Sequence, residues 1–139
     1  MEITFEGQKV VVARFHGHTI KTDQPVSSGG ENSAPAPFEL YLASIGTCAG
    51  IYVKSFCDHR NIPTDKIKII QTTVSDNETG LPVNIKIDIR LPADFPEKYK
   101  ASVINVAELC KVKKSIKSPP VFEITATLSS PDTSEGNAG

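Results

Sequence analysis

A long uncharged stretch constrains this chain most strongly, because it predicts one buried helix from Pro37 to Arg60. No residue between Glu39 and Lys54 is charged, and apolar side chains fall on nearly every side of a helix built from this stretch. Pro37 suits the first helical position, and Glu39 is favourable to the N-terminal end of the helix dipole. A helix that is apolar all round belongs inside a protein. We therefore expect this helix to be the central core element.

A membrane-spanning role fits this stretch poorly. Its uncharged run, Leu40 to Val53, has 14 residues and includes serine, threonine and two glycines. A transmembrane helix needs roughly 18 or more consecutive apolar residues. We therefore expect a core helix of a soluble domain, with no membrane partner.

Two glycines inside this helix require an explanation, because each costs about 1 kcal/mol relative to alanine in a helix interior. Ala43, Gly46 and Gly50 share one narrow face of small residues. Such a face lets another backbone approach closely. One hypothesis is a close crossing with a second helix, including that of a symmetry-related copy. The alternative is a local accommodation to neighbouring side chains.

The bulk properties fit a single globular domain. The chain has 139 residues, of which 39% are hydrophobic and 22% charged. Fifteen basic and sixteen acidic residues give a net charge of −1, which argues against a nucleic-acid partner. Met1 is followed by Glu2 and an alternating pattern rather than by a basic, then apolar leader, so we expect a cytoplasmic protein. Three cysteines are too few for a disulfide scaffold.

The hydrophobic periodicity predicts an α+β domain with mainly antiparallel sheet. It covers residues 1–128, and residues 129–139 have the composition of a disordered tail. A Ser-, Gly- and Pro-rich stretch, residues 26–36, predicts a mobile loop before the central helix. The expected elements are a three-stranded meander over residues 2–23 with turns at Gly7 and Gly17, the central helix, strands at 66–75 and 83–90, a helix at 96–110 and a final strand at 121–128.

Most catalytic and cofactor motifs are missing from the sequence. There is no C-x-x-C pair, no phosphate-binding glycine loop after a strand and no G-x-S-x-G elbow. His16 and His18 could place two imidazoles on one face of a strand, but two ligands without a third make a weak metal site. We expect neither a metal nor a cofactor.

The chemistry that remains is that of the cysteines. A free cysteine is usually a small buried hydrophobe, and Cys57 fits that description. It projects from the opposite side of the predicted helix to Cys48, nine residues earlier. Cys48 and Cys110 each lie in or at the end of a helix, and only tertiary structure can bring them together. Two thiols that meet in this way can cycle through a sulfenic acid and a disulfide.

The basic segment after Cys110 has two interpretations. Its four lysines are Lys111, Lys113, Lys114 and Lys117. They can complement the dipole at a helix C-terminus. Alternatively, they create a field that favours a thiolate at Cys110.

The sequence from Asp23 to Cys48 resembles the OsmC/Ohr family of thiol-dependent hydroperoxide reductases, most of all its OsmC-like branch. The similar residues are D-Q-P, then G-G-E-N-S-A-P-A-P-F-E-L-Y-L-A-S-I-G-T-C, and A-E-L-C at Ala107 to Cys110. The similarity in the order of elements covers residues 1–128. The P-x-E-L…C run together with a second cysteine at a helix end is fairly specific.

The resemblance implies a fold and a reaction. It implies an intertwined homodimer whose central helices lie back to back, with active sites at the subunit interface. Cys48 would attack an organic hydroperoxide and become a sulfenic acid, and Cys110 would resolve it as a disulfide. A cellular dithiol would then reduce the disulfide, without metal, haem or flavin.

The resemblance also implies an arginine, oriented by a glutamate, that stabilises the thiolate. Here the sequence departs from the family pattern. Phe38 follows the proline where the enzymes have glutamate, so the carboxylate comes one place later as Glu39. Lys111 follows the second cysteine, where proline is common. Of the three arginines we choose Arg14, because Arg60 lies at the far end of the helix and Arg90 on the polar face of a strand.

Two other functions stay open. The first is a non-catalytic OsmC-like dimer that binds a small apolar or thiol-containing ligand at the interface. The second is a purely structural role that leaves Cys48 and Cys110 inert. We favour the peroxidase, because burial alone does not explain a second cysteine in a suitable position.

Overall fold

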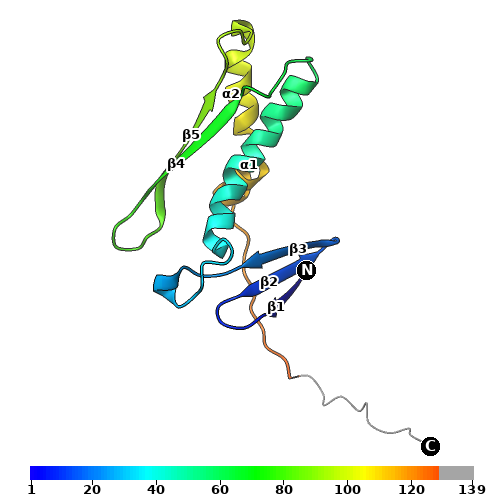
Figure 1. Ribbon diagram of the computed structural model, residues 1–139. Helices are drawn as coiled ribbons and strands as arrows, with labels where there is room; N and C mark the ends of the chain where they lie inside the picture. Colours follow the sequence, from blue (N-terminus) through cyan, green and yellow to red (C-terminus); the bar gives the residue numbers. More distant parts are fainter. Residues whose placement is uncertain (129–139) are drawn as a thin grey trace, which may run out of the picture.

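The computed structural model describes residues 1–128 and forms an α+β fold around one long helix (Figure 1). Residues 129–139, where a disordered tail was predicted, lie outside the described residues. The elements are β1 (Glu2–Phe5), β2 (Val11–Phe15), β3 (His18–Thr22), the 3-10 turn η1 (Val26–Ser28), α1 (Pro37–Asp58), β4 (Lys68–Ser75), β5 (Pro82–Arg90), η2 (Glu97–Tyr99), α2 (Lys100–Glu108) and α3 (Lys111–Lys117).

The first three strands form the predicted antiparallel meander, in the order β1-β2-β3. Gly7 and Gly17 lie at its two turns with φ of 64° and 77°, a conformation that glycine adopts without steric cost. Phe15 pairs with His18, which leaves His16 and Gly17 as a two-residue turn. His16 also has a positive φ, 47°. Two left-handed residues match the right-handed twist of the paired strands.

The central helix α1 begins at Pro37, as predicted, and ends at Asp58, two residues before the predicted end. Asn61 has a φ of 54°, and the N–H of Ile62 turns back to the carbonyl of Cys57 at 3.0 Å. A left-handed residue just past a helix is a common way to end it. The polar residues after Asp58 therefore form the turn that leads to β4.

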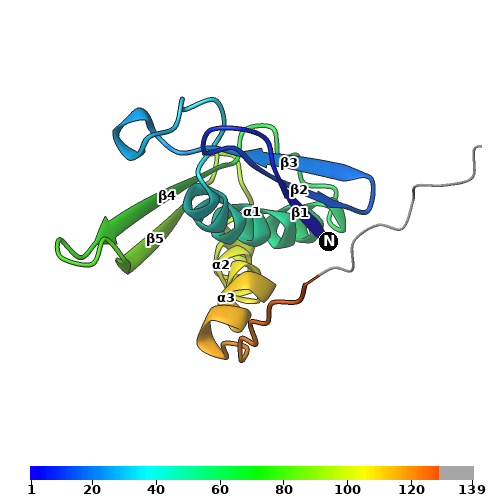
Figure 2. The same ribbon diagram turned by 90° about the horizontal axis from the view of Figure 1, so that it is seen from below.

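Only one face of α1 is buried in a single chain. Its buried residues are Ile45, Ala49, Val53, Phe56 and Cys57, and they pack with Val103 and Ala107 of α2. The opposite strip, Ala43, Thr47 and Ile51, is exposed, and Ile51 is 57% exposed. Figure 2, seen from below, shows α2 and α3 on one side of α1 and the β4–β5 hairpin on another. The expectation that α1 is buried on all sides is therefore wrong for a single chain.

By length and apolarity alone, α1 could cross a membrane. This is weak evidence, because the core helix of a soluble protein meets the same criterion. The packing of its buried face against α2 is that of a core helix.

Strands β4 and β5 form the predicted antiparallel hairpin, in register from Lys68 opposite Arg90 to Val74 opposite Asn84. The alternation in β5 has its expected effect, since Ile87 and Ile89 pack on the core while Lys86 and Arg90 are exposed. The side chains that alternate along β5 thus separate the core from solvent.

Strand β4 approaches the small-residue face of α1. The side-chain amide of Gln71 donates to the carbonyl of Leu42 at 2.9 Å. A Cβ atom on Gly46 would lie 2.7 Å from Gln71 Oε1, so glycine leaves room for this side chain. Within one chain a strand, and not a second helix, meets Gly46. The predicted helix crossing concerns a second copy and stays a prediction.

The predicted helix at residues 96–110 is divided, and the lysine-rich segment after it is itself a helix. A 3-10 turn precedes α2, which ends at Glu108. Cys110 has non-helical backbone angles, φ −44° and ψ 118°, and is the N-cap of α3. Lys111 therefore begins a helix, whereas Lys114 and Lys117 lie in its last turn, where they complement the dipole.

The predicted final strand at residues 121–128 is wrong for the single chain. These residues have no regular secondary structure, and Val121, Phe122, Ile124 and Leu128 are 80 to 101% exposed. A strand requires a neighbour for its backbone hydrogen bonds, and nothing in residues 1–128 of the same chain pairs with this segment.

The loop before α1 is held by one buried carboxylate rather than free. Asp23 is fully buried; it accepts the N–H and hydroxyl of Ser33 at 2.9 and 2.8 Å, the N–H of Gln24 at 2.7 Å and that of Glu31 at 3.1 Å. These bonds, led by the Ser33 N–H, lower the pKa of Asp23 to about 2. A Cβ atom on Gly30 would lie 2.0 Å from the Gln24 carbonyl oxygen, so the closed loop excludes any side chain there.

We predict that Asp23→Asn lowers the melting temperature in a pH-dependent way. The folded pKa of about 2 lies below the unfolded value of 3.8. The stabilisation is therefore complete above about pH 5 and lost as the pH falls through 4 toward 2. Thermal melts of wild type and variant should differ near neutral pH and converge in acid. Asp65→Asn, at an exposed carboxylate, is the control. A difference that is independent of pH would contradict the assignment.

Candidate active site

Cys48 lies in the middle of α1, at the border between its buried and exposed faces. Its side chain is partly exposed, while the next residue, Ala49, is fully buried. The backbone of α1 fixes this thiol at the surface of the core. A partly exposed thiol on a rigid element is accessible to a small reactant.

Cys110 lies against α1 beside this thiol. Its sulfur is fully buried, donates to the carbonyl of Ile45 at 3.9 Å and accepts the N–H of Lys113 at 3.5 Å. Ile45 precedes Cys48 by less than one helical turn, and the Cys110 thiol is itself a hydrogen-bonding neighbour of Cys48. The two cysteines predicted to form the site are therefore brought together.

The surroundings of Cys48 favour its thiolate. The backbone N–H of Val112 lowers the pKa of Cys48 most, and burial opposes it. The Cys110 thiol, the backbone N–H of Lys111 and the Lys111 charge lower it further. N–H donors and a cation stabilise the anion more than the neutral thiol. The net result is a Cys48 pKa below that of an ordinary cysteine.

Cys57 has the opposite character. It is fully buried among Phe56, Val103 and other core side chains. Burial raises the pKa of Cys57, and the Asp58 carboxylate raises it further. An apolar, buried thiol of this kind is inert. The interpretation of Cys57 as a core residue agrees with this position.

Glu39 has a structural partner at the start of its own helix. Its Oε2 accepts the backbone N–H of Ala36 at 2.8 Å. This bond satisfies one of the N–H groups that a helix start leaves without a partner. Within one chain, Glu39 thus stabilises the first turn of α1, and its predicted role in orienting an arginine stays a prediction.

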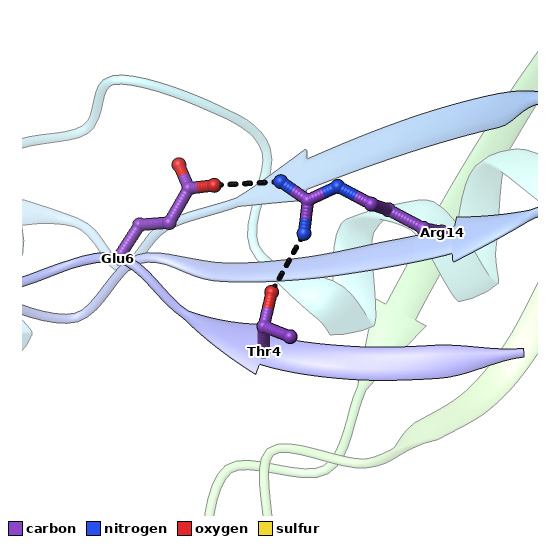
Figure 3. Close-up of polar contacts among 3 residues, drawn as sticks. All are labelled: Thr4, Glu6 and Arg14. Atoms are coloured by element: carbon purple, nitrogen blue, oxygen red, sulfur yellow. Dashed lines mark hydrogen bonds and ion pairs between the residues drawn. The ribbon is translucent and has the colours of Figure 1, made fainter. Parts of the chain in front are cut away.

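Arg14 lies on the N-terminal sheet, where it has partners of its own (Figure 3). Its Nη1 donates to Thr4 Oγ1 at 2.8 Å, and its Nη2 pairs with Glu6 Oε1 at 2.9 Å. The other two arginines are also engaged. Arg60 stacks on the ring of Phe56 at 3.8 Å, and Arg90 pairs with Asp88 at 3.2 Å. The role of Arg14 toward Cys48 stays a prediction.

Sequence reasoning missed the contribution of the start of α3. The N–H of Val112 and the N–H and charge of Lys111 lower the pKa of Cys48, and neither residue was assigned to the site. The available signal was the position of Lys111 directly after a cysteine, as the first of the seven residues that form α3. The N-terminal end of a helix favours a nearby anion.

A cavity of about 390 Å³ opens between β5 and α3, and neither cysteine is among its lining residues. Ile45, whose carbonyl contacts Cys110, lines it together with Ile85, Ile87 and Ile116. At its polar side, Lys113 pairs with Glu108 at 3.2 Å, across the junction that holds Cys110. The cavity is therefore apolar on its floor and charged at one edge.

His16 and His18 lie at the β2–β3 turn, and both contact the ring of Phe15, with centroids 6.1 and 6.0 Å apart. In the described part of the chain, no three His, Cys, Asp or Glu side chains gather as metal ligands.

We predict that Cys48 is the fast-reacting thiol of this chain. Iodoacetamide at about neutral pH should alkylate Cys48 at least about tenfold faster than Cys57, because a thiolate is the nucleophile. Mass spectrometry of tryptic peptides over time measures both rates. The Cys48→Ser variant should lose the fast phase and Cys57→Ala should keep it. Equal rates at the two positions would contradict the pKa assignment.

This chain is similar to a known protein family and to solved structures. Residues 30–125 match the family of OsmC-like proteins. A search of curated protein sequences finds no match. One similar solved structure is that of a Psychrobacter arcticus protein named for osmotic stress induction and a detoxification response. Its TM-score is 0.71 at 22% sequence identity, and the match covers 82% of this chain and 85% of that one. A second solved structure, from structural genomics, gives 0.63 at 18% identity over 85% and 88%.

These structural likenesses establish the fold, and the family match establishes the relationship. The matched residues include both Cys48 and Cys110. The chain belongs to the OsmC-like protein family.

Proposed function

We propose that this protein is a cysteine-based peroxidase that reduces organic hydroperoxides. The observation that carries the proposal is the paired environment of Cys48, a partly exposed thiol of lowered pKa whose hydrogen-bonding neighbour is the buried thiol of Cys110. A reactive thiolate next to a second thiol suits reversible oxidation.

The proposed cycle balances in three steps. The Cys48 thiolate attacks the peroxide, the O–O bond breaks, and the products are Cys48 sulfenic acid and, after protonation of the alkoxide, an alcohol. The Cys110 thiol then attacks the sulfenic sulfur, which forms the Cys48–Cys110 disulfide and releases water. A cellular dithiol reduces the disulfide by thiol–disulfide exchange and is itself oxidised.

The exposure of the two cysteines indicates which sulfur of the disulfide the dithiol attacks. Cys110 is fully buried, whereas Cys48 is partly exposed. A reductant reaches the exposed sulfur more easily, so the transient mixed disulfide forms on Cys48 and Cys110 leaves.

The neighbouring cavity supports an organic substrate. Its isoleucine floor, at Ile45, Ile85, Ile87 and Ile116, offers apolar contact for a hydrocarbon group, and Ile45 also contacts Cys110 through its carbonyl. Binding sites for small molecules are mostly apolar and concave. Hydrogen peroxide would gain nothing from this surface.

We predict that sub-stoichiometric cumene hydroperoxide forms the Cys48–Cys110 disulfide within seconds to minutes. Disulfide mapping by mass spectrometry measures it. Cys48→Ser should abolish the bond and Cys110→Ser should accumulate the sulfenic acid at Cys48, which dimedone traps. Cys57→Ala is the matched control and should behave as wild type.

Absence of the bond, or a bond that forms only over hours, would exclude the peroxidase. The same cavity would then favour the alternative, a non-catalytic protein that binds a small apolar or thiol-containing ligand. Ligand-induced stabilisation with both cysteines still reduced would identify that case.

We also propose that the active form is a homodimer. The chain exposes 10955 Å², whereas a monomeric globular protein of this size exposes roughly 7,000 Å². Part of this excess lies on apolar side chains within residues 1–128 that a second copy could cover.

The excess includes two apolar surfaces. One is the strip Ala43, Thr47 and Ile51 on α1, next to the unpartnered Oε1 of Gln71. The other is the extended segment 121–128, whose apolar side chains are exposed. A second copy that covers the strip and supplies a strand edge for the segment would bury both. A cytoplasmic location, where thiols stay reduced, fits the three free cysteines.

We predict that Ile51→Lys weakens this dimer. Ile51 is 57% exposed in one chain, so a lysine there costs an isolated subunit little, but a charge in a helix–helix interface lacks a partner. Analytical ultracentrifugation at micromolar concentration should show twice the chain mass for wild type and a shift toward monomer for the variant. Val74→Lys, at an exposed position on the hairpin, should not change the mass. A monomeric wild type would refute the dimer.

A further inference from the structure

A second cavity opens past the C-terminal end of α1, and its volume is about 600 Å³. This volume is within the usual range of small-molecule sites. Residues 60–66, which follow α1, and residues 92–99, which lead into α2, line it. Figure 1 shows both segments at the end of the molecule opposite the N-terminal sheet. Asp58, the last residue of α1, lies about 15 Å from Cys48 along the helix axis, so this cavity is separate from the candidate active site.

The walls of this cavity are fixed by packing and by short turns. Ile62, Phe95 and Tyr99 pack on the buried core of α1 and α2. The N–H of Phe95 donates to the carbonyl of Pro92 at 3.0 Å, which closes one turn of the wall. Proline, whose φ is fixed by its ring, lines the cavity at three positions, Pro63, Pro92 and Pro96. A site with walls of this kind loses little conformational entropy when a ligand binds.

Arg60 brings a guanidinium group of defined position to this cavity. Its Cζ lies 3.8 Å from the centroid of the Phe56 ring and 5.4 Å from that of the Tyr99 ring, and its Nη1 donates to the Phe56 carbonyl at 3.2 Å. Within residues 1–128 Arg60 has no carboxylate partner, whereas Arg14 and Arg90 each have one. The N–H groups of Arg60 that do not bond Phe56 can therefore bind a carboxylate or phosphate through two parallel hydrogen bonds.

The charges around the cavity favour an anion over a cation. Three cations line it against two carboxylates, and none of the five forms an ion pair within the described chain: Arg60, Lys66, Lys98, Asp65 and Asp94. The Tyr99 ring already has Lys98 Nζ at 4.9 Å in addition to Arg60. A cationic ligand would meet positive charge at this aromatic surface, whereas an anionic ligand is attracted to it.

We propose that this cavity binds a small organic anion, whose carboxylate or phosphate pairs with Arg60. The apolar body of the ligand lies on Phe95 and the three prolines, and Lys98 adds Coulomb attraction. This inference goes beyond the proposed peroxidase and does not depend on it, because neither cysteine lines the cavity and binding requires no peroxide.

The test titrates the isotope-labelled full-length protein with naphthylacetate, naphthyl phosphate and neutral naphthylacetamide, and follows the backbone amide signals by NMR. The anions should shift the amides of residues 60–66 and 92–99, and naphthylacetamide should bind at least about tenfold more weakly than the better anion. The better anion distinguishes a carboxylate ligand from a phosphate ligand. Arg60→Gln should weaken anion binding at least about tenfold, whereas Arg90→Gln, which removes an equal charge from β5, should bind as wild type.

A second variant does not depend on the contact between Arg60 and Phe56. Asp94→Asn removes a negative charge from the cavity and should tighten anion binding by about two- to threefold. Added salt should weaken binding of the anions and leave that of the amide unchanged. Equal affinity for the anions and the amide, unchanged binding by Arg60→Gln or weaker binding by Asp94→Asn would overturn the proposal. Absence of shifts at millimolar concentrations of both anions would overturn it as well.

Discussion

Close packing of α1 on α2 through small side chains is the interaction on which the rest of this structure depends. Ala49 of α1 is fully buried, and Val103 and Ala107 of α2 are 0% and 6% exposed. Small residues at a helix contact let the two axes approach closely. The chain just past α2 therefore arrives at α1, where Cys110 meets the carbonyl of Ile45. A bulkier residue at Ala49 or Ala107 would separate the helices and, with them, the two thiols.

The same apolar packing creates an electrostatic problem that α3 resolves. A thiol buried on an apolar helix loses hydration, and for Cys57 this burial, with the Asp58 carboxylate, outweighs the Lys54 and Arg60 charges and raises the pKa. Cys48 is on the same helix, yet its pKa is lowered. The difference arises first from the N–H of Val112, then from the Cys110 thiol and from the N–H and charge of Lys111, none of which acts on Cys57. Reactivity is thus assigned to one cysteine by the element that packs opposite it.

Local signals in the sequence were sufficient for most of the fold. Pro37 marks the start of α1, Gly7 and Gly17 mark the meander turns, and the alternating isoleucines of β5 identify its buried face. Each of these signals acts on its own residue or its immediate neighbours. For the same reason, the sequence identified Cys48 and Cys110 as a pair only through their resemblance to a family, since 62 positions separate them.

Other features depend on contacts that a sequence does not display. No glycine or proline marks the break between α2 and α3 at Cys110. The docking of the Cys110 sulfur on α1 imposes this break. Segment 121–128 has the alternation of a strand, but a strand needs a partner, and no strand within residues 1–128 pairs with it. Glu39 was assigned from the family pattern, and its bond to Ala36 reflects a one-residue shift that changes which way a helical side chain points.

Covering the exposed face of α1 would change the hydration of Cys48 and so the stability of its thiolate. Cys48 is partly exposed in one chain, and burial already opposes its thiolate. A second copy that covers Ala43, Thr47 and Ile51 would remove more water from this region and raise the desolvation cost of the anion. Coulomb attraction also strengthens as water leaves, because the local dielectric constant falls. A cation that lies within reach of Cys48 therefore contributes more in an assembled dimer than in an isolated chain, so an interface around this thiol selects for a positive charge beside it.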